Sequence, residues 1–307
     1  MISQTILNEM IEQHQLWLED PATGKQFDLR NERINELDFQ EGNLSKAFIL
    51  GCDIKECCLK NVNFTEAQIG FTAISKCKMQ NINFQQASLS SVRFMNNEIG
   101  SSSFYGSTNL GGVFYKNNLE SSNFKSDEEN EEGIPILTTI INHCALDGNN
   151  FSLSDFENTS LNEENFVKFK ENNFQNCNFK NCDLKGLFFS ECDLTGSSIE
   201  NTIFDECNFT KSKLEALNFD TCSLANCLGD NKNIITVQAH LFTCVIAGTK
   251  MYVDTLVKDQ EEWLESPDSV IVADLLEAFP DSGYTEEELT NWWSIWKPIF
   301  ERIIKSY

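Results

Sequence analysis

Apolar residues recur at every fifth position along most of this chain. The series starts at Leu29 and ends at Leu224, with an interruption after Phe124 and a shift of register after Phe166. Thirty-six of its 37 positions are apolar, Asn109 being the exception, and 17 of the 24 Phe lie in it, although the chain as a whole is only 41% hydrophobic. A five-residue period fits neither a helix, with about 3.6 residues per turn, nor a strand, with a period of about 2. The backbone is therefore expected to turn a corner once in every repeat.

Two further positions of the repeat are also restricted. The residue two places before each apolar centre is usually small, as at Ala47, Val62, Cys52, Cys177 and Cys207. The residue between the two is often Asn or Asp, whose short side chains bond to nearby backbone and suit tight turns. Each repeat thus reads small, polar, apolar and then two variable residues.

This pattern resembles the pentapeptide repeat family, whose repeat is roughly Ala-(Asp/Asn)-(Leu/Phe)-X-X. The resemblance covers residues 27–228, about two thirds of the chain. It implies an all-β solenoid, a right-handed quadrilateral pentapeptide-repeat β-helix of about nine coils, whose centres and small residues point inward. The open coil at each end of such a rod needs a cover.

The two ends of the chain supply such covers in our interpretation. Residues 1–26 predict an N-terminal capping helix with an apolar face that includes Ile11 and Trp17. Residues 229–307 predict a small α/β or helical module, a β-hairpin followed by helices, of which the last begins with a capping box at Thr285 and Glu288. Both ends resemble those of pentapeptide repeat proteins from phages and prophages.

The 12 Cys first suggest metal ligands or disulfides, but their positions argue against both. Ten occupy the small position of the repeat, and only Cys58 and Cys244 do not. No Cys-x2-Cys pair occurs and the three His are scattered, so we expect no metal and no cofactor. Unbridged thiols in this number favour a reducing compartment, and hence a cytoplasmic protein.

The charge of the chain restricts its partners. With 47 acidic and 23 basic residues the net charge is −24, which argues against direct binding to nucleic acid or to an anionic membrane. No stretch of about 18 apolar residues is present to span a membrane. Motifs of nucleotide-binding, metallopeptidase and serine hydrolase enzymes are missing. These features predict a non-enzymatic protein that binds a protein partner with a basic surface.

Two functions fit this description. The resemblance implies, through family members that confer quinolone resistance, an acidic mimic of DNA that binds a DNA-acting enzyme such as DNA gyrase. Against this, the rod carries an excess of 13 acidic residues, about half the charge of a duplex of equal length. The alternative is a scaffold or secreted effector that binds another protein through the rod faces or the Trp-rich tail. Strong charge asymmetry between the faces of the rod would favour mimicry of DNA. Apolar patches on those faces would favour a scaffold.

Two groups of residues are candidate partner-binding sites. The first is the acidic interruption of the repeat, residues 125–134, expected to form a loop expelled from the rod. Its candidate residues are Asp127, Glu128, Glu129, Glu131 and Glu132. The second is the cluster of Trp292, Trp293 and Trp296 in the last helix, which also suggests a homodimer formed through the C-terminal module.

Overall fold

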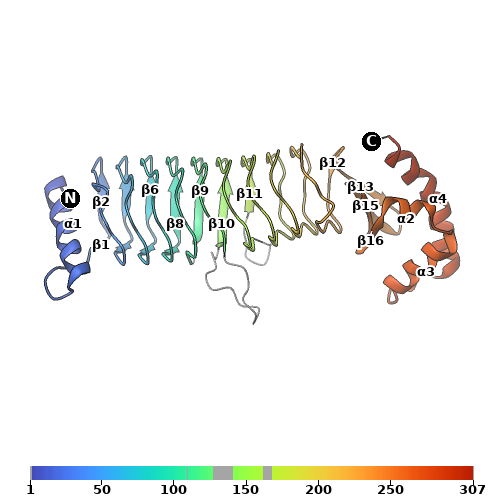
Figure 1. Ribbon diagram of the computed structural model, residues 1–307, viewed down its shortest axis with the longest axis horizontal. Coiled ribbons are helices and arrows are strands. Elements are labelled where there is room, and N and C mark those ends of the chain that lie inside the picture. The colour runs from blue at the N-terminus through green and yellow to red at the C-terminus, as the bar shows by residue number, and fades with distance from the viewer. Residues whose placement is uncertain (1, 109, 127–140, 162–167, 307) are drawn as a thin grey trace.

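The chain folds into a straight rod of stacked coils with a different cover at each end (Figure 1). The computed structural model describes all residues except 1, 109, 127–140, 162–167 and 307. Helix α1 (Gln4–Glu19) lies over the first coil, and a sheet with three helices lies over the last. The predicted β-solenoid is confirmed, and nine apolar centres, from Phe39 to Leu214, stack along one of its faces.

Each coil has four faces, numbered here in the order in which the chain passes through them. Face 1 begins with a parallel sheet of β1 (Asp28–Arg30), β3 (Phe48–Leu50), β5 (Gln68–Gly70) and β7 (Ser88–Ser90). Face 2 carries a seven-stranded parallel sheet of β2 (Arg33–Asn35), β4 (Asp53–Lys55), β6 (Ala73–Ser75), β8 (Val92–Met95), β9 (Leu110–Tyr115), β10 (Ile141–Asp147) and β11 (Lys168–Lys170). Faces 3 and 4 are held by single parallel bridges, which begin with Asp38 beside Cys58 and Asn43 beside Asn63.

The coils stack with a repeat of 20 residues, and the two irregularities in the sequence change this step without breaking the stack. The backbone N–H of Asn117 donates to the side chain of Asn149, 32 residues further on, across the acidic interruption. The backbone N–H of Asn149 in turn donates to the side-chain oxygen of Asn172, 23 residues further on, across the predicted shift of register. The first insertion therefore adds 12 residues to one coil and the second adds three residues to another, while the hydrogen bonds between successive Asn residues continue.

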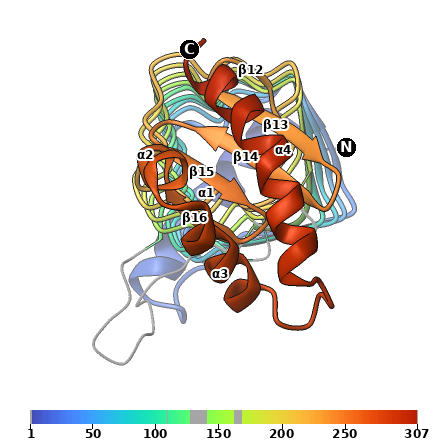
Figure 2. The same ribbon diagram turned by 90° about the vertical axis from the view of Figure 1, so that its right-hand side faces the viewer.

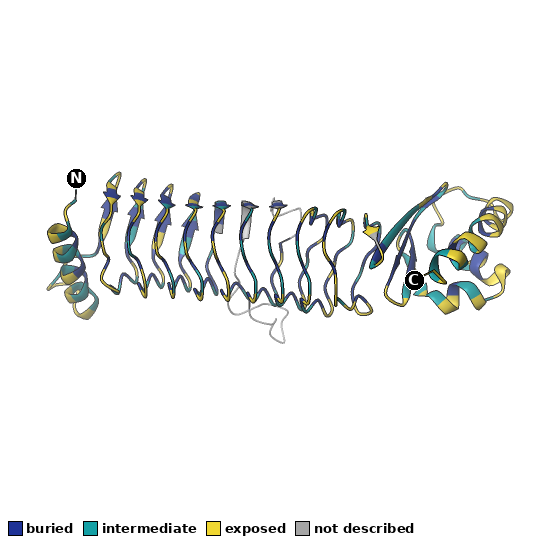
Figure 3. Cartoon of the chain, turned by 90° about the horizontal axis from the view of Figure 1, so that it is seen from above, coloured by how far each residue is buried: buried dark blue, intermediate teal, exposed yellow. Residues whose placement is uncertain are grey.

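Aromatic stacking fills the core of the rod. On face 4, Phe64, Phe84, Phe104, Phe124, Phe156 and Phe179 form one column with ring centroids 4.6 to 5.4 Å apart. Figure 3 shows the buried residues following the inner side of every coil. Each centre packs on the equivalent side chain of the next coil, so burial follows directly from the five-residue period.

The small position of the repeat also points inward, as the resemblance implies. Nine described Cys occupy it and are buried free thiols. Burial raises the pKa of Cys177, Cys182 and Cys192 to about 12. Cys244 lies outside the repeat but is buried as well, in the C-terminal module. Among the Cys whose side chains the structure describes, only Cys58, on the outer side of face 3, is partly exposed.

In the middle of the rod the same inward position is polar. Asn97, Asn117, Asn149 and Asn172 form a buried ladder in which each side chain donates to a backbone carbonyl of the preceding coil. The first three also donate to the side-chain oxygen of the next Asn. A buried amide is stable only when its donors and acceptors are satisfied, and here the ladder satisfies them across the interruption.

Helix α1 covers the first coil with Leu7 and Ile11 and ends at Glu19, shorter than the predicted residues 1–26. Buried His14 joins it to the rod. The backbone N–H of Phe27 donates to Nδ1 of His14 at 2.9 Å, so Nε2 carries the proton and donates to the carbonyl of Ser45 at 2.9 Å. Burial lowers the pKa of His14, which keeps the ring neutral.

The C-terminal module is larger than the predicted hairpin. It contains an antiparallel sheet of β12 (Asp230–Asn231), β13 (Ile234–Ala239), β14 (Phe242–Ala247), β15 (Lys250–Val253) and β16 (Leu256–Asp259). One face of this sheet closes the rod core with Ile234, Val245, Ala247 and Tyr252, and the hydroxyl of Tyr252 donates to the carbonyl of Cys222 in the last coil.

Three helices cover the other face of this sheet (Figure 2). They are α2 (Gln260–Glu265), α3 (Asp268–Ala278) and α4 (Glu286–Ile304). The predicted capping box of Thr285 and Glu288 starts α4, which continues through Pro298. The module therefore caps the rod with one side of its sheet and builds a second hydrophobic core on the other.

Candidate partner-binding surface

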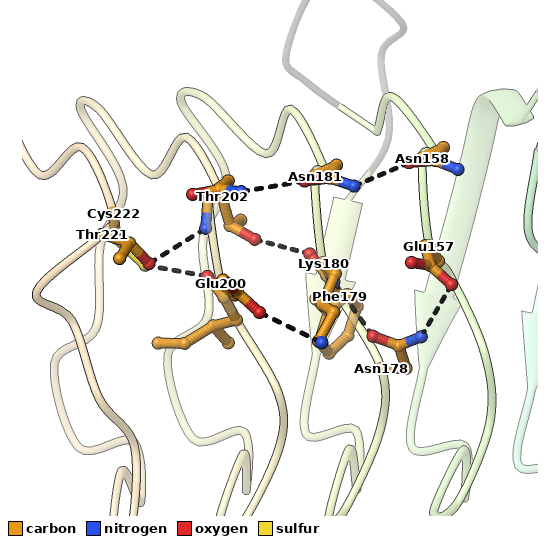
Figure 4. A network of polar contacts seen from close by, with 12 residues as sticks. Glu157, Asn158, Asn178, Phe179, Lys180, Asn181, Glu200, Thr202, Thr221 and Cys222 are labelled. Carbon is orange, nitrogen blue, oxygen red and sulfur yellow. Dashed lines mark hydrogen bonds and ion pairs between the residues drawn. The ribbon is translucent and has the colours of Figure 1, made fainter. Parts of the chain in front are cut away.

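Several charged side chains of the rod pair with side chains of the neighbouring coil. Figure 4 shows such a network on face 4, where Lys180 approaches Glu200 at 3.0 Å and the amide of Asn178 donates to Glu157 at 3.2 Å. Similar pairs join Lys46 to Glu66, Lys76 to Glu56, Lys211 to Glu191, and Lys213 to Asp193. Exposed pairs of this kind stabilise a protein little, but they neutralise carboxylates locally.

The remaining charge is distributed unevenly along the axis of the rod. The front half, residues 27–126, has ten acidic and ten basic residues and is neutral. The rear half, residues 127–228, has 19 acidic and six basic residues, and the tail from residue 229 has 14 and six. Residues 127–307 therefore account for 21 of the 24 excess negative charges of the chain. The charge asymmetry of the rod therefore runs from one end to the other.

An exposed aromatic side chain marks the neutral front half. Phe71 lies at the corner between β5 and β6, with 72% of its surface exposed and a φ of +50°. The equivalent corners of the neighbouring coils carry Asn31, Gly51 and Ser91. Left-handed backbone is unusual for a bulky residue and is commonest for Gly and Asn. Phe71 therefore stands alone above a row of small corner residues.

A groove of about 500 Å³ runs beside Phe71 along face 2. This Phe71 groove is lined by Asn31, Glu32, Arg33, Gly51, Cys52, Asp53, Phe71, Ala73, Arg93 and Met95. Strand pairing places Arg33, Asp53, Ala73 and Arg93 in one row across four coils. The groove thus combines apolar side chains with guanidinium groups at both ends, the residue types that dominate protein interfaces.

Comparison with known proteins agrees with the repeat. Residues 49–124 match the family model of the pentapeptide repeat region, and residues 173–210 and 189–226 match that of pentapeptide repeats in eight copies. The chain is a pentapeptide repeat protein. Among curated proteins, no sequence matches it. An association of this pentapeptide repeat protein with phages stays a prediction.

Solved pentapeptide repeat structures resemble the rod only distantly. QnrB1, a plasmid-mediated fluoroquinolone resistance protein, is 16% identical with a TM-score of 0.47, over 66% of this chain and 94% of that one. HetL, involved in heterocyst differentiation regulation in the cyanobacterium Nostoc sp. strain PCC 7120, is 15% identical with a TM-score of 0.31, over 69% and 92%. We draw no functional argument from likenesses at this level.

The Trp residues predicted to bind a partner belong mainly to the core of the C-terminal module. Trp293 is fully buried and Trp292 is 3% exposed. The indole of Trp293 donates to Asp268 at 3.1 Å, and that of Trp292 donates to the carbonyl of Ala239. Trp296 is half-buried and, together with Trp292, lines a separate groove of about 360 Å³. The buried pair stabilises the module, and a partner-binding role of the three Trp stays a prediction, as does a homodimer formed through the module.

The acidic residues predicted to contact a partner, Asp127, Glu128, Glu129, Glu131 and Glu132, lie outside the described residues. Their role stays a prediction. Within the described part of the chain, no group of three or more His, Cys, Asp or Glu is placed to hold a metal ion. The four described helices include none that is long and apolar enough to cross a membrane.

Proposed function

We propose that this pentapeptide repeat protein is a non-enzymatic scaffold that binds another protein through the front half of its rod. The observation that carries the proposal is Phe71, a highly exposed aromatic residue in a conformation that few aromatic residues adopt, beside a groove in a neutral surface. Clustered apolar groups with arginines at the rim are typical of energetically important interface positions. A cytoplasmic location accords with the 11 described Cys, all free thiols.

A second candidate is the acidic mimic of DNA that binds a DNA-acting enzyme such as DNA gyrase. The observation in its favour is the charge of residues 127–307, which hold 21 of the 24 excess negative charges. Since the front half is neutral, mimicry would be confined to the rear half and the tail. This candidate predicts binding that weakens with salt, because charge attraction is screened.

One affinity experiment separates the two candidates. Immobilised full-length protein is incubated with cytosolic lysate at low and high salt, beside the variants Phe71→Asn and Phe188→Asn. Phe188 serves as the control because it too is a highly exposed Phe, 63% exposed, but lies on face 2 in the rear half of the rod. Asn occupies the equivalent position in the next coil, so the coil tolerates Asn at this position. A third variant replaces the five acidic residues between 127 and 132 with Gln or Ser.

The scaffold requires a captured protein that survives high salt, is retained by Phe188→Asn and is lost with Phe71→Asn. Mimicry requires a DNA-acting enzyme that is lost at high salt or with the neutralised acidic segment and is unaffected by Phe71→Asn. Equal capture by wild type and Phe71→Asn contradicts the proposed front-half scaffold. All variants are first compared with wild type for melting temperature.

A further inference from the structure

We propose that the Phe71 groove binds an acidic segment of a partner protein, with a carboxylate at Arg93 and an apolar side chain against Phe71 and Met95. The proposal rests on the proposed function and adds the chemistry of the partner.

The part of the chain that carries both Phe71 and Arg93 lacks acidic residues. Residues 67–97 contain Lys76, Lys78 and Arg93 but no Asp or Glu, in a chain with 47 acidic residues. At physiological ionic strength the Debye length is about 8 Å. A partner seated in the groove is therefore largely screened from the carboxylates of the rear half and responds to the charges that line the groove, with Arg93 at one end and Arg33, Glu32 and Asp53 at the other.

Arg93 has no carboxylate of its own to bind. Its neighbours in the ladder of face 2 are Ala73 and Val113, and the described residues include none that forms an ion pair with it. By contrast, Arg30 in the first coil lies 2.7 Å from Asp28. A guanidinium presents a planar pair of donors that matches a carboxylate in two parallel hydrogen bonds, so the exposed Arg93 offers a complete site for one carboxylate.

The apolar part of the site lies next to this cation. Phe71 is exposed, Met95 is half-buried, and Ala73 between them is buried. Backbone bonding fixes the corner that carries the ring, because the N–H of Phe71 donates to the carbonyl of Ser90 in the next coil at 2.9 Å. An aromatic side chain on a fixed backbone has only two torsions to immobilise, so it loses little conformational entropy on binding.

The other end of the groove distinguishes a protein from a nucleic acid. Glu32 and Asp53 line it beside Arg33. A nucleic acid strand carries a phosphate at every nucleotide and would meet these two carboxylates. A polypeptide can place a neutral or basic residue there, while its acidic residue remains at Arg93.

The test uses a random library of short displayed peptides selected on the full-length protein. The selected peptides are then synthesised and their affinities measured by fluorescence polarisation. We expect sequences that combine Asp or Glu with a large apolar residue. Arg93→Glu and Phe71→Asn should each weaken their binding at least about tenfold, as for a central interface residue. Phe188→Asn should bind them as wild type does, and selection on Arg93→Glu should yield basic residues in place of acidic ones.

Other outcomes overturn the proposal. The proposed binding of a carboxylate by Arg93 is contradicted if the selected peptides lack acidic residues. It is also contradicted if acidic peptides bind Arg93→Glu as tightly as wild type. If the lysate protein is still lost with Phe71→Asn, the scaffold stands and only the acidic chemistry fails. A single-stranded oligonucleotide that displaces the peptides at equal concentration would assign the groove to nucleic acid instead.

Discussion

The corner residue of each pentapeptide, two positions after the apolar centre, bears the main local strain of this rod. Almost every described corner has a positive φ, for example +54° at Asn31, +67° at Gly51 and +57° at Gln86. Left-handed backbone costs an ordinary L-residue roughly 1–2 kcal/mol, and Asn and Gly tolerate it best. Phe71 occupies such a corner with an exposed ring, and strain of this kind is often kept for function.

Replacing Phe71 by Asn should therefore stabilise the protein. We expect the free energy of unfolding to rise by roughly 0.5–1 kcal/mol, because Asn relieves the strain and little buried surface is lost. Chemical denaturation measures this change. Gln86→Asn, at an equivalent and exposed corner, should gain less. A loss of stability on Phe71→Asn would show that the ring stabilises the coil by packing on it, and would contradict a role reserved for binding a partner.

At the scale of single elements, the two covers attach to the rod by different means. Helix α1 uses a few apolar contacts and the neutral imidazole of His14, which is also stacked on Trp17 at 5.4 Å between ring centroids. The C-terminal sheet instead continues the rod core and bonds to the last coil, for example from Thr249 to Asp220. The first attachment contains an imidazole whose pKa is lowered by burial, whereas the second depends mainly on apolar packing.

Docking of α1 should weaken in mild acid. The folded state lowers the pKa of His14 below its ordinary value of about 6.5, so below that pH the unfolded or undocked state binds more protons. The stabilisation is complete above about pH 6.5 and is lost as the pH falls towards the folded pKa. Hydrogen exchange of the α1 amides, measured from neutral to mildly acidic pH, should show progressive opening. His14→Asn, which cannot be charged, should exchange at a rate independent of this titration once intrinsic exchange is corrected.

Removing the C-terminal cover should make the rod associate. Deleting residues 230–307 exposes the last coil, including Leu224 and Cys227, and its open backbone groups. Uncovered strand edges pair with other chains, so we expect oligomers or precipitation in light scattering at concentrations where the full chain is monodisperse. A monomeric truncated rod would show that the sheet is dispensable as a cap.

Sequence periodicity predicted the rod well because each repeat places one large side chain inside, and apolar centres such as Phe94 are readily recognised. It missed the buried ladder through Asn117, since an inward Asn looks the same in sequence as an outward one. It also missed the Phe71 groove, because the corner position is variable in the repeat. The five-stranded sheet was read as a hairpin, since segments such as Leu256–Asp259 alternate too briefly to be recognised.

For the whole molecule, the separation of the Phe71 groove from the acidic residues along the axis of the rod determines partner binding more than the net charge does. The neutral front half presents the Phe71 groove, and the acidic rear half and tail hold nearly all the excess charge. A net charge of −24 taken as uniform suggests a single acidic surface, but the two halves present different chemistry to a partner. A front-half partner and a basic rear-half partner would therefore not compete for the same surface.

The regular stacking of one coil on the next, usually with a step of 20 residues, makes the length of the rod proportional to its number of coils. Each coil sets the two covers apart by one strand spacing, about 4.8 Å, whatever its outward residues are. Removal of one whole coil, such as residues 67–86, would shorten the distance by that amount and leave every stacking column in register. Insertions of other lengths, like those after Asn117 and Asn149, change the surface without changing the length. Distance and surface chemistry can therefore evolve independently in this molecule.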